Sequence, residues 1–228
     1  MPARTEPEAL SLDTDVGFPL RVAVLIFDGV EVLDFAGPFE VFGVARDIQG
    51  AFGFEVFTVA LEDKAVVARN GLRVLPHVRA ADMGQVDVLV VPGGFGSRRE
   101  MRNEDTLAFV RAASGAARVT LSVCTGALIL GAAGLLRGLA ATTHFAALDE
   151  LRGLDCGEVR PQARVVDNGR ILTSAGISAG IDGALHLVSR LMGAACAIET
   201  AKYMQYDWSR RAVDHAPASH KHQDDAAY

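Results

Sequence analysis

An uncharged run of 18 residues, from Val119 to Leu136, constrains the fold of this chain more than any other segment. Its length approaches that of a helix that crosses a bilayer. However, its first third consists mostly of β-forming residues, whereas the remainder is rich in Ala, Leu and Gly. This change of composition predicts a buried strand over residues 118–123 that turns directly into a buried helix reaching Leu136, and it argues against a membrane span.

The same alternation of strand and helix recurs along the chain. Short apolar runs predict further strands at residues 21–27, 54–60 and 86–91. Helical segments separate or follow these strands, at residues 33–45, 99–114, 145–152, 179–191 and 195–206. Continuous apolar strands separated by helices are typical of a parallel sheet that helices cover on both faces. We therefore expect an α/β fold of three layers with a mostly parallel central sheet.

Two hairpins and one short strand complete the predicted elements. A turn at Asn70-Gly71 joins extended segments 65–68 and 72–75. A second turn, Asp167-Asn168-Gly169, joins segments 164–166 and 171–173, and residues 141–143 form the short strand.

The chain has 228 residues and is predicted to form one domain over residues 20–208. Residues 1–19 are expected to be a disordered tail, and residues 209–228 a flexible one. The second tail contains three histidines that are expected to be solvated rather than to bind a metal: His215, His220 and His222.

Charge and cysteine content limit the expected partners and location. The net charge is −6 and no Lys/Arg cluster is present, so nucleic acid is not an expected partner. Residues 1–19 carry several acidic side chains and lack the apolar core of a signal peptide. The three cysteines are an odd number without paired spacing, which favours reduced thiols and a cytoplasmic location.

Cys124 is the strongest candidate for a catalytic residue. It lies where the predicted strand ends and the predicted helix begins, so a sharp turn would lift its sulfur out of the sheet, as in a nucleophile elbow. The free N–H groups of the helix start would favour the thiolate. The alternative is that Cys124 acts only as a small apolar residue buried in the core. Cys156, in a predicted loop, and Cys196, in a predicted helix, have no comparable setting.

Two other loops follow predicted strands and carry usable chemistry. Asp34 lies between Leu33 and Phe35, an apolar setting that would shift its pKa and suit proton transfer, although it could instead cap a helix. Gly93-Gly94 would let the backbone approach a ligand and direct amide groups at negative charge, although it could be a tight turn alone. Ligands bind beyond the carboxyl ends of parallel strands, so these loops are expected near Cys124.

Histidines are weaker candidates. His144 follows a predicted strand and could act as a base, but the sequence after it is typical of a packed helix start, so we favour a structural role. His77 and His186 are also expected to be hydrogen-bonded to neighbours rather than catalytic.

Four motifs occur in order between about Arg21 and Tyr206: Val91-Pro92-Gly93-Gly94, Ser122-Val123-Cys124-Thr125-Gly126-Ala127, Ala141-Thr142-Thr143-His144 and Thr173-Ser174-Ala175-Gly176-Ile177-Ser178-Ala179-Gly180-Ile181-Asp182. Together they resemble the ThiJ/PfpI superfamily. With the segment Leu33-Asp34-Phe35-Ala36-Gly37-Pro38, the chain is most similar to isocyanide hydratases and to the amidotransferase-like sensor domains of AraC-type regulators.

The resemblance implies a flavodoxin-like sandwich, usually a homodimer, with Cys124 as the nucleophile and Asp34 facing its sulfur. It implies that Thr125 binds beside the nucleophile. Backbone groups at Gly93, Gly94, Gly126 and Ile177 would then form the substrate and oxyanion site. The implied reaction adds water to a small isocyanide through a covalent thioimidate and gives an N-substituted formamide, with no metal or cofactor.

Other activities stay open at this point. Protease-like members of the superfamily have His directly after the nucleophile, where this chain has Thr125, and the His-x-Glu pair of glutaminases is absent after His186. A ligand-sensing or redox-sensing protein without turnover and a glyoxalase- or amidase-type enzyme on the same Cys are alternatives. The 20 residues after Trp208 are too few for a pair of DNA-binding helical motifs, so no DNA-binding role is expected.

Overall fold

A computed structural model describes residues 17–208 and 213–215 of the chain. In this part, eight strands form one central sheet, in the order β12-β10-β11-β7-β6-β1-β2-β5. Neighbouring strands are parallel except for the antiparallel pair β10 and β11. The strands are β1 (Leu20–Leu25), β2 (Phe54–Ala60), β5 (Val78–Arg79), β6 (Val88–Val91), β7 (Val119–Val123), β10 (Val165–Asp167), β11 (Ile171–Ser174) and β12 (Val213–His215).

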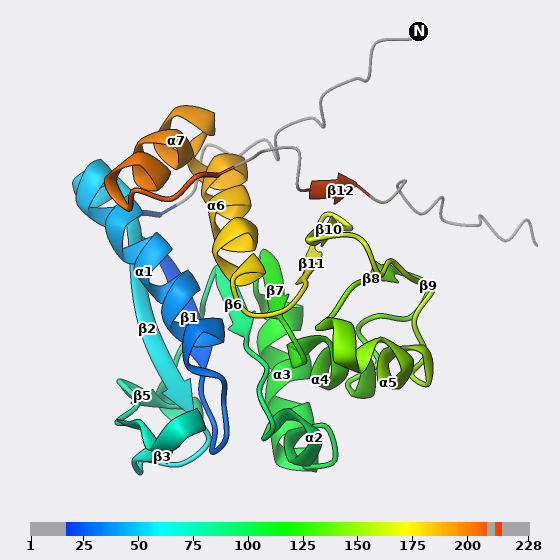
Figure 1. Cartoon of the computed structure of the whole chain (residues 1–228). Coiled ribbons are helices and arrows are strands. Elements are labelled where there is room, and N and C mark those ends of the chain that lie inside the picture. The colour runs from blue at the N-terminus through cyan, green and yellow to red at the C-terminus, as the bar shows by residue number, and fades with distance from the viewer. Residues whose placement is uncertain (1–16, 209–212, 216–228) are drawn as a thin grey trace, which may run out of the picture.

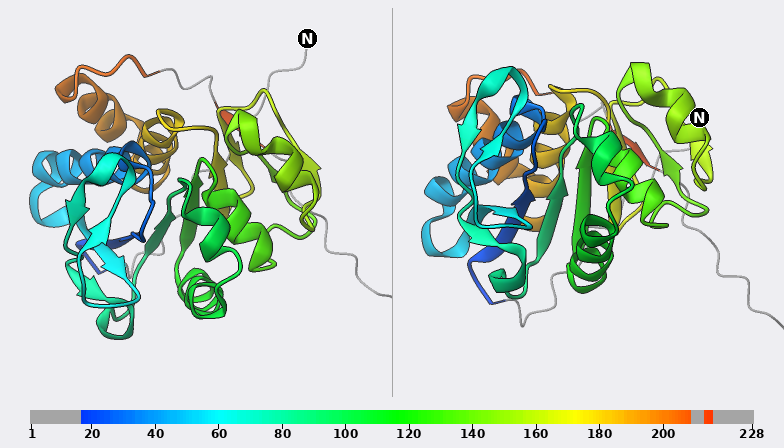
Figure 2. Two further views of the ribbon diagram at one scale, coloured as in Figure 1. Left: turned by 60° about the horizontal axis from the view of Figure 1, so that its bottom comes forward. Right: turned by 90° about the horizontal axis from the view of Figure 1, so that it is seen from below.

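Helices cover both faces of this sheet, as the ribbon views show (Figures 1 and 2). One layer contains α1 (Val32–Gln49), α6 (Ala179–Met192) and α7 (Ala194–Tyr203). The other contains α2 (Ser97–Glu100), α3 (Glu104–Ala116), α4 (Gly126–Ala132) and α5 (Leu148–Arg152). The predicted α/β sandwich with a mostly parallel sheet is therefore confirmed.

Within the described residues, two small sheets and four 3-10 turns lie in the connections. Strands β3 (Val66–Val67) and β4 (Arg73–Val74) form the first predicted hairpin, and β8 (Ala140–Ala141) pairs in parallel with β9 (Glu158–Val159). The 3-10 turns are Gly50–Phe52, Arg69–Gly71, Ala80–Asp82 and Phe145–Ala147.

The uncharged run lies in the centre of the core. Every residue of β6 and β7 is buried, and the residues of α4 are nearly all buried too. A strand covered on both faces needs apolar side chains at successive positions, which explains why these runs do not alternate. Within residues 17–208 and 213–215, no helix is long and apolar enough to cross a membrane.

Several element boundaries differ from the predicted ones. The segment 99–114 forms two helices, because Asn103 caps α3 by accepting a hydrogen bond from the Asp105 amide at 3.1 Å. The helix after Cys124 ends at Ala132 instead of Leu136, and Gly134 follows with a φ of +77°. The segment 145–152 begins as a 3-10 turn before it becomes α5.

The predicted C-terminal tail contains a strand that the sequence did not reveal. Strand β12 pairs in parallel with β10, at the edge of the sheet. Residues 1–16, 209–212 and 216–228, including His220 and His222, lie outside the described residues.

The order of the strands brings functionally important loops together at one edge of the sheet. Strand β1 lies between β2 and β6 in the sheet. The next strand, β2, pairs with one edge of β1, and β6, which comes later in the chain, pairs with the other edge. The loops that follow β1 and β6 meet at the carboxyl ends of the strands, where open α/β sheets bind ligands, and the Glu31 amide donates a hydrogen bond to the Gly93 carbonyl at 2.9 Å.

Candidate active site

Cys124 occupies a strained turn between β7 and α4. Its φ is +56°, in the left-handed region that a residue with a side chain rarely adopts. Its N–H lies 3.1 Å from the carbonyl oxygens of Ser174 and Ala175, and its own carbonyl accepts a hydrogen bond from the Thr143 hydroxyl at 2.8 Å. These contacts fix both sides of the residue, and the backbone has the geometry of a nucleophile elbow.

Two glycines allow the neighbouring loops to touch this turn. A Cβ at Gly126 would lie 2.0 Å from the carbonyl oxygen of Val91, and one at Gly93 would lie 2.4 Å from the amide nitrogen of Thr125. Neither distance is possible for a real side chain. The strand-end loops after β6 and β7 are therefore in direct backbone contact because both positions lack side chains.

Asp34 lies in the first turn of α1 and is completely buried. One carboxyl oxygen, Oδ2, accepts a hydrogen bond from the Gly93 amide at 3.1 Å. The other, Oδ1, has no hydrogen-bond partner among the described residues. The alternative interpretation of Asp34 as a helix cap is wrong, because the N-cap position belongs to Glu31.

The carboxyl group of Asp34 and the thiol of Cys124 perturb each other. Burial raises the pKa of Asp34 to about 7, although the Cys124 thiol and the Gly93 amide oppose this effect. Burial also raises the pKa of Cys124 to about 12, and the charge of Asp34 adds to it. The backbone amides of Ile177 and Thr125 lower the pKa of Cys124 by smaller amounts.

These pKa shifts correct one expectation. The amides at the start of α4 do favour the thiolate, but burial and the nearby carboxylate outweigh them, so Cys124 is held as a thiol. The two groups titrate as a coupled pair, and the pair loses its first proton near pH 7.

The hydroxyl of Thr125 holds the glycine loop. It accepts hydrogen bonds from the Gly94 amide and from the Ser97 hydroxyl, both at 2.9 Å, and donates to the Gly94 carbonyl at 3.2 Å. Only its backbone amide acts on the sulfur. Ser97 is completely buried and was not identified from the sequence, where a serine after a glycine turn carries no distinctive signal.

Ile177 contributes its backbone to the site. It follows β11 and has a φ of +46°, and its amide is among the groups that lower the pKa of Cys124. His144 lies behind this loop, since a Cβ at Gly176 would lie 2.3 Å from its ring. The His144 Nδ1 accepts a hydrogen bond from the Ala146 amide at 3.2 Å, which supports the predicted structural role.

The other histidines and cysteines lie in different surroundings. The ring of His77 accepts a hydrogen bond from the Thr58 amide at 3.1 Å, and His186 lies 2.7 Å from Asp167. Cys196 is buried in α7, and Cys156 is half-buried with its sulfur near the Leu151 carbonyl. Among residues 17–208 and 213–215, no group of three His, Cys, Asp or Glu side chains could hold a metal ion.

The sequence model of the DJ-1/PfpI family matches residues 20–190. The chain belongs to the DJ-1/PfpI family. This confirms the ThiJ/PfpI resemblance of the four motifs.

Three similar proteins illustrate the range of this family. An isonitrile hydratase of Pseudomonas putida is 39% identical over 87% of this chain and 80% of that protein. The HTH-type transcriptional regulator GbdR of Pseudomonas aeruginosa is 27% identical over 90% of this chain, which spans only 55% of the regulator. The crystal structure of a ThiJ/PfpI family protein from Pseudomonas syringae is 33% identical, with a TM-score of 0.75 over 83% of this chain and 76% of that one.

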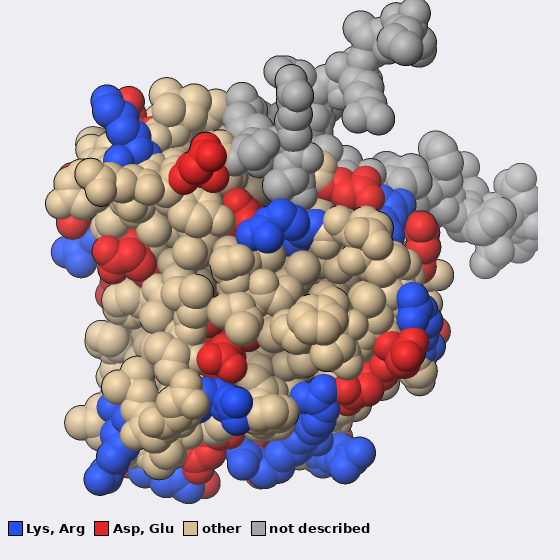
Figure 3. All heavy atoms as spheres, viewed as in Figure 1, with Lys and Arg blue, Asp and Glu red and all other residues tan. Residues whose placement is uncertain are grey.

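Exposed apolar side chains of this DJ-1/PfpI member lie on the loops that build the site. Leu33 precedes Asp34, Phe95 follows Gly94, Phe145 follows His144, and Ile177 carries the amide near the sulfur; each is at least 37% exposed. Uncharged residues make up much of the face in Figure 3, with acidic and basic residues scattered among them and along its lower edge. These side chains suit an apolar group on a ligand, and the Arg69 guanidinium lies over the Phe95 ring at 3.9 Å.

Proposed function

We propose that this protein hydrates small isocyanides (isonitriles) to N-substituted formamides. The observation that carries the proposal is the buried pair of Asp34 and Cys124, in which the pKa of the carboxyl group is about 7. A carboxyl group with this pKa can both accept and return a proton at neutral pH. The 39% identity to an isonitrile hydratase supports the same reaction class.

The first step joins the thiol to the substrate. The ionised Asp34 accepts the proton of the Cys124 thiol as the sulfur attacks the terminal carbon of R–N≡C. The amides of Ile177 and Thr125 stabilise the negative charge that develops on the sulfur, as their effect on the pKa of Cys124 indicates. Asp34 then delivers the proton to the same carbon, and the product is a thioimidate, R–N=CH–S–Cys124.

The second step releases the product. Water adds to the thioimidate carbon. Asp34 accepts one proton from this water and donates it to the nitrogen, which gives R–NH–CH(OH)–S–Cys124. This adduct collapses to R–NH–CHO as the sulfur leaves and regains its proton through Asp34. The sum is the addition of one water molecule, so the reaction needs no oxidant or reductant.

A direct test is incubation of the purified protein with an alkyl isocyanide and detection of the formamide by NMR. We expect turnover by the wild type and its loss in Cys124→Ser and Asp34→Asn. Cys156→Ser is the matched control, because Cys156 lies outside the site, and its turnover should equal that of the wild type. Undiminished formamide production by Asp34→Asn would refute the proposal.

The alternative of a redox sensor receives less support. Peroxide oxidises thiolates, and the pKa of about 12 keeps Cys124 protonated at neutral pH. Mass spectrometry after mild peroxide treatment distinguishes the two functions, since a sensor would form the sulfenic or sulfinic acid at Cys124 without any isocyanide turnover.

A further inference from the structure

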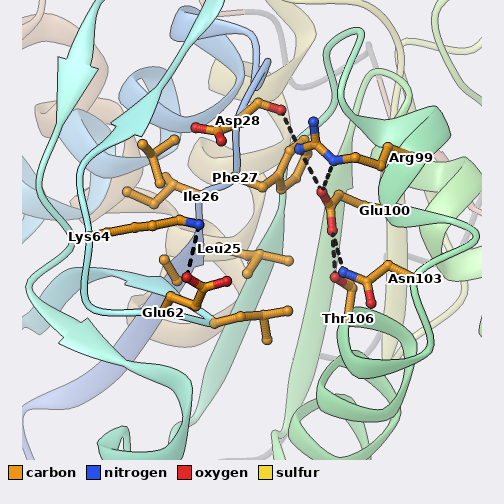
Figure 4. Close-up of a pocket in the computed structure, with 13 residues that line it drawn as sticks. Leu25, Ile26, Phe27, Asp28, Glu62, Lys64, Arg99, Glu100, Asn103 and Thr106 are labelled. Atoms are coloured by element: carbon orange, nitrogen blue, oxygen red, sulfur yellow. Dashed lines mark hydrogen bonds and ion pairs between the residues drawn. The ribbon is translucent and has the colours of Figure 1, made fainter.

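A cavity lies at the carboxyl ends of β1 and β2, and Cys124 is not among its lining residues (Figure 4). We name it the Lys64–Arg99 cavity. Its volume is about 170 Å³. It lies between the end of β1, the segment after β2, and helices α2 and α3, and it is lined by Leu25, Ile26, Phe27, Asp28, Ala60, Leu61, Glu62, Lys64, Val66, Arg99, Glu100, Asn103 and Thr106.

The lining combines an apolar floor with a polar wall. Leu25, Phe27 and Val66 are among the buried apolar residues of the floor. In the wall, Glu100 is 4% exposed and both of its carboxyl oxygens accept hydrogen bonds, Oε1 from Arg99 at 2.8 Å and Oε2 from Thr106 at 2.5 Å. The buried carboxylate is therefore neutralised within the protein and has little capacity left for a ligand.

Two cations face the cavity from opposite sides (Figure 4). Lys64 comes from the segment after β2 and pairs with Glu62 at 2.8 Å. Arg99 comes from α2, and its Nε and Nη2 bind Glu100 and the Asp28 carbonyl, while Nη1 makes no hydrogen bond among the described residues. The hydrogen bond and charge of Glu62 raise the pKa of Lys64, so Lys64 stays cationic.

Both cations keep hydrogen-bond donors that no described residue uses. The Lys64 ammonium can donate two further hydrogen bonds, and the Arg99 guanidinium can donate from Nη1. Oδ1 of Asp28 accepts the Val67 amide at 2.7 Å and Oε2 of Glu62 pairs with Lys64, so an anion would compete with Glu62 for Lys64 and would have to avoid the second oxygen of Asp28. An apolar floor below free cationic donors suits an amphipathic anion.

We propose that the Lys64–Arg99 cavity binds a small aliphatic carboxylate, and that α2 transmits this binding to the Cys124 site. The volume of about 170 Å³ fits a ligand of about six heavy atoms, because a cavity of about 150 Å³ accommodates benzene. The carboxylate would lie between Lys64 and Arg99, and the aliphatic group on the floor. The acidic residues of the lining limit the affinity of an anion, so we expect millimolar binding.

Helix α2 connects the cavity to the active site. Arg99 and Glu100, at its end, line the cavity, whereas Ser97, at its start, donates to the Thr125 hydroxyl at 2.9 Å. The loop after β1 provides a second connection. Arg99 binds the Asp28 carbonyl at 2.8 Å, and the next carbonyl, of Gly29, accepts the Gly96 amide at 3.1 Å. A ligand that binds Arg99 and moves its side chain would therefore shift α2 and the loop after β1, which contact Gly94 and Thr125.

Titration with sodium butyrate, followed by ¹H–¹⁵N NMR of the full chain, tests the binding site. We expect saturable shifts of the amides of residues 62–67 and 99–103, and no such shifts with the uncharged isostere butyramide. Lys64→Gln should weaken butyrate binding at least about fivefold, because it removes a charged donor. Lys202→Gln is the matched control, since Lys202 also pairs with a nearby glutamate and both lysines are at least 60% exposed. Absence of saturation, equal binding of butyramide, or equal weakening by both variants would overturn the site.

The rate of Cys124 alkylation by iodoacetamide, followed by peptide mass spectrometry, tests the coupling. Saturating butyrate should change this rate at least about twofold in the wild type and less in Lys64→Gln at the same concentration. An unchanged rate at saturation would overturn the coupling through α2. Neither measurement requires isocyanide turnover, so the result is independent of the proposed hydratase reaction.

Discussion

Replacement of Asp34 by Asn should change how the stability of the protein depends on pH. In the folded protein, burial raises the pKa of Asp34 from 3.8 to about 7. Between these two values, the folded state holds a proton that the unfolded state has lost, so stability falls as pH rises through this window. The pKa difference corresponds to about 4 kcal/mol of lost stability above pH 7.

The Asn side chain removes this cost without a large change of shape. Its carbonyl oxygen can still accept the hydrogen bond of the Gly93 amide, which Asp34 Oδ2 accepts at 3.1 Å. The stability of Asp34→Asn relative to wild type should therefore rise by about 4 kcal/mol between pH 4 and pH 8. Cys124 does not contribute to this change, because its pKa of about 12 keeps the thiol neutral throughout the range.

Urea unfolding at pH 4, 6 and 8, followed by circular dichroism, measures this difference. Other titrating groups, such as Asp167 with its lowered pKa, affect both proteins and cancel in the comparison. Asp105→Asn is a control on the surface. A difference between Asp34→Asn and wild type that stays constant from pH 4 to pH 8 would refute the assignment of a raised pKa to Asp34.

Three further outcomes are expected. For isocyanide hydration, kcat/KM should rise about tenfold per pH unit below 7 and level off above it, because Asp34 must be ionised to accept the thiol proton; a flat profile from pH 5 to 8 would contradict this role. Thr143→Val should cost about 1–3 kcal/mol in urea unfolding, because it leaves the Cys124 carbonyl without its 2.8 Å donor, whereas Thr143→Ser should be close to wild type. Gly126→Ala should cost at least about 2 kcal/mol, because its Cβ would lie 2.0 Å from the Val91 oxygen, while Gly43→Ala, with no atom within 4 Å, should be neutral or stabilising; equal effects would disprove the close approach.

The sequence predicts the sheet and the elbow because burial leaves few options for an uncharged run. Residues 119–136 could cross a membrane or fill a core, and their change of composition favours a strand followed by a helix, as β7 and α4 confirm. In a parallel sheet, the loops after β1, β6 and β7 all lie at the carboxyl ends of the strands. The sequence therefore predicts that Asp34, Gly93 and Cys124, which lie in or just after these loops, are close together.

Other features depend on tertiary contacts that no local pattern encodes. Strand β12 consists of three residues in a polar segment, and only the free edge of β10 makes it a strand. Ser97 acts through its hydroxyl, and nothing in its neighbours distinguishes it from an ordinary surface position. Thr143 lies in one of the four motifs, but the motif does not reveal its hydrogen bond to the Cys124 carbonyl. The amides at the helix start lower the pKa of Cys124 as expected, but burial, which cannot be read from a helix start, outweighs them. The homodimer, the cytoplasmic location and the limits of the domain stay predictions.

The proton shared by Asp34 and Cys124 connects the burial of the site with the proposed reaction. A thiolate exposed at a helix start would be nucleophilic at rest, but it would have no proton to deliver. Burial next to Asp34 raises both pKa values, so the pair retains one proton above pH 7 and can move it from sulfur to carboxylate during attack. The terminal carbon of an isocyanide must receive a nucleophile and a proton at the same atom, one after the other. A buried acid–thiol pair provides both from one direction, and for this reason the proposed chemistry fits burial of Cys124 better than exposure.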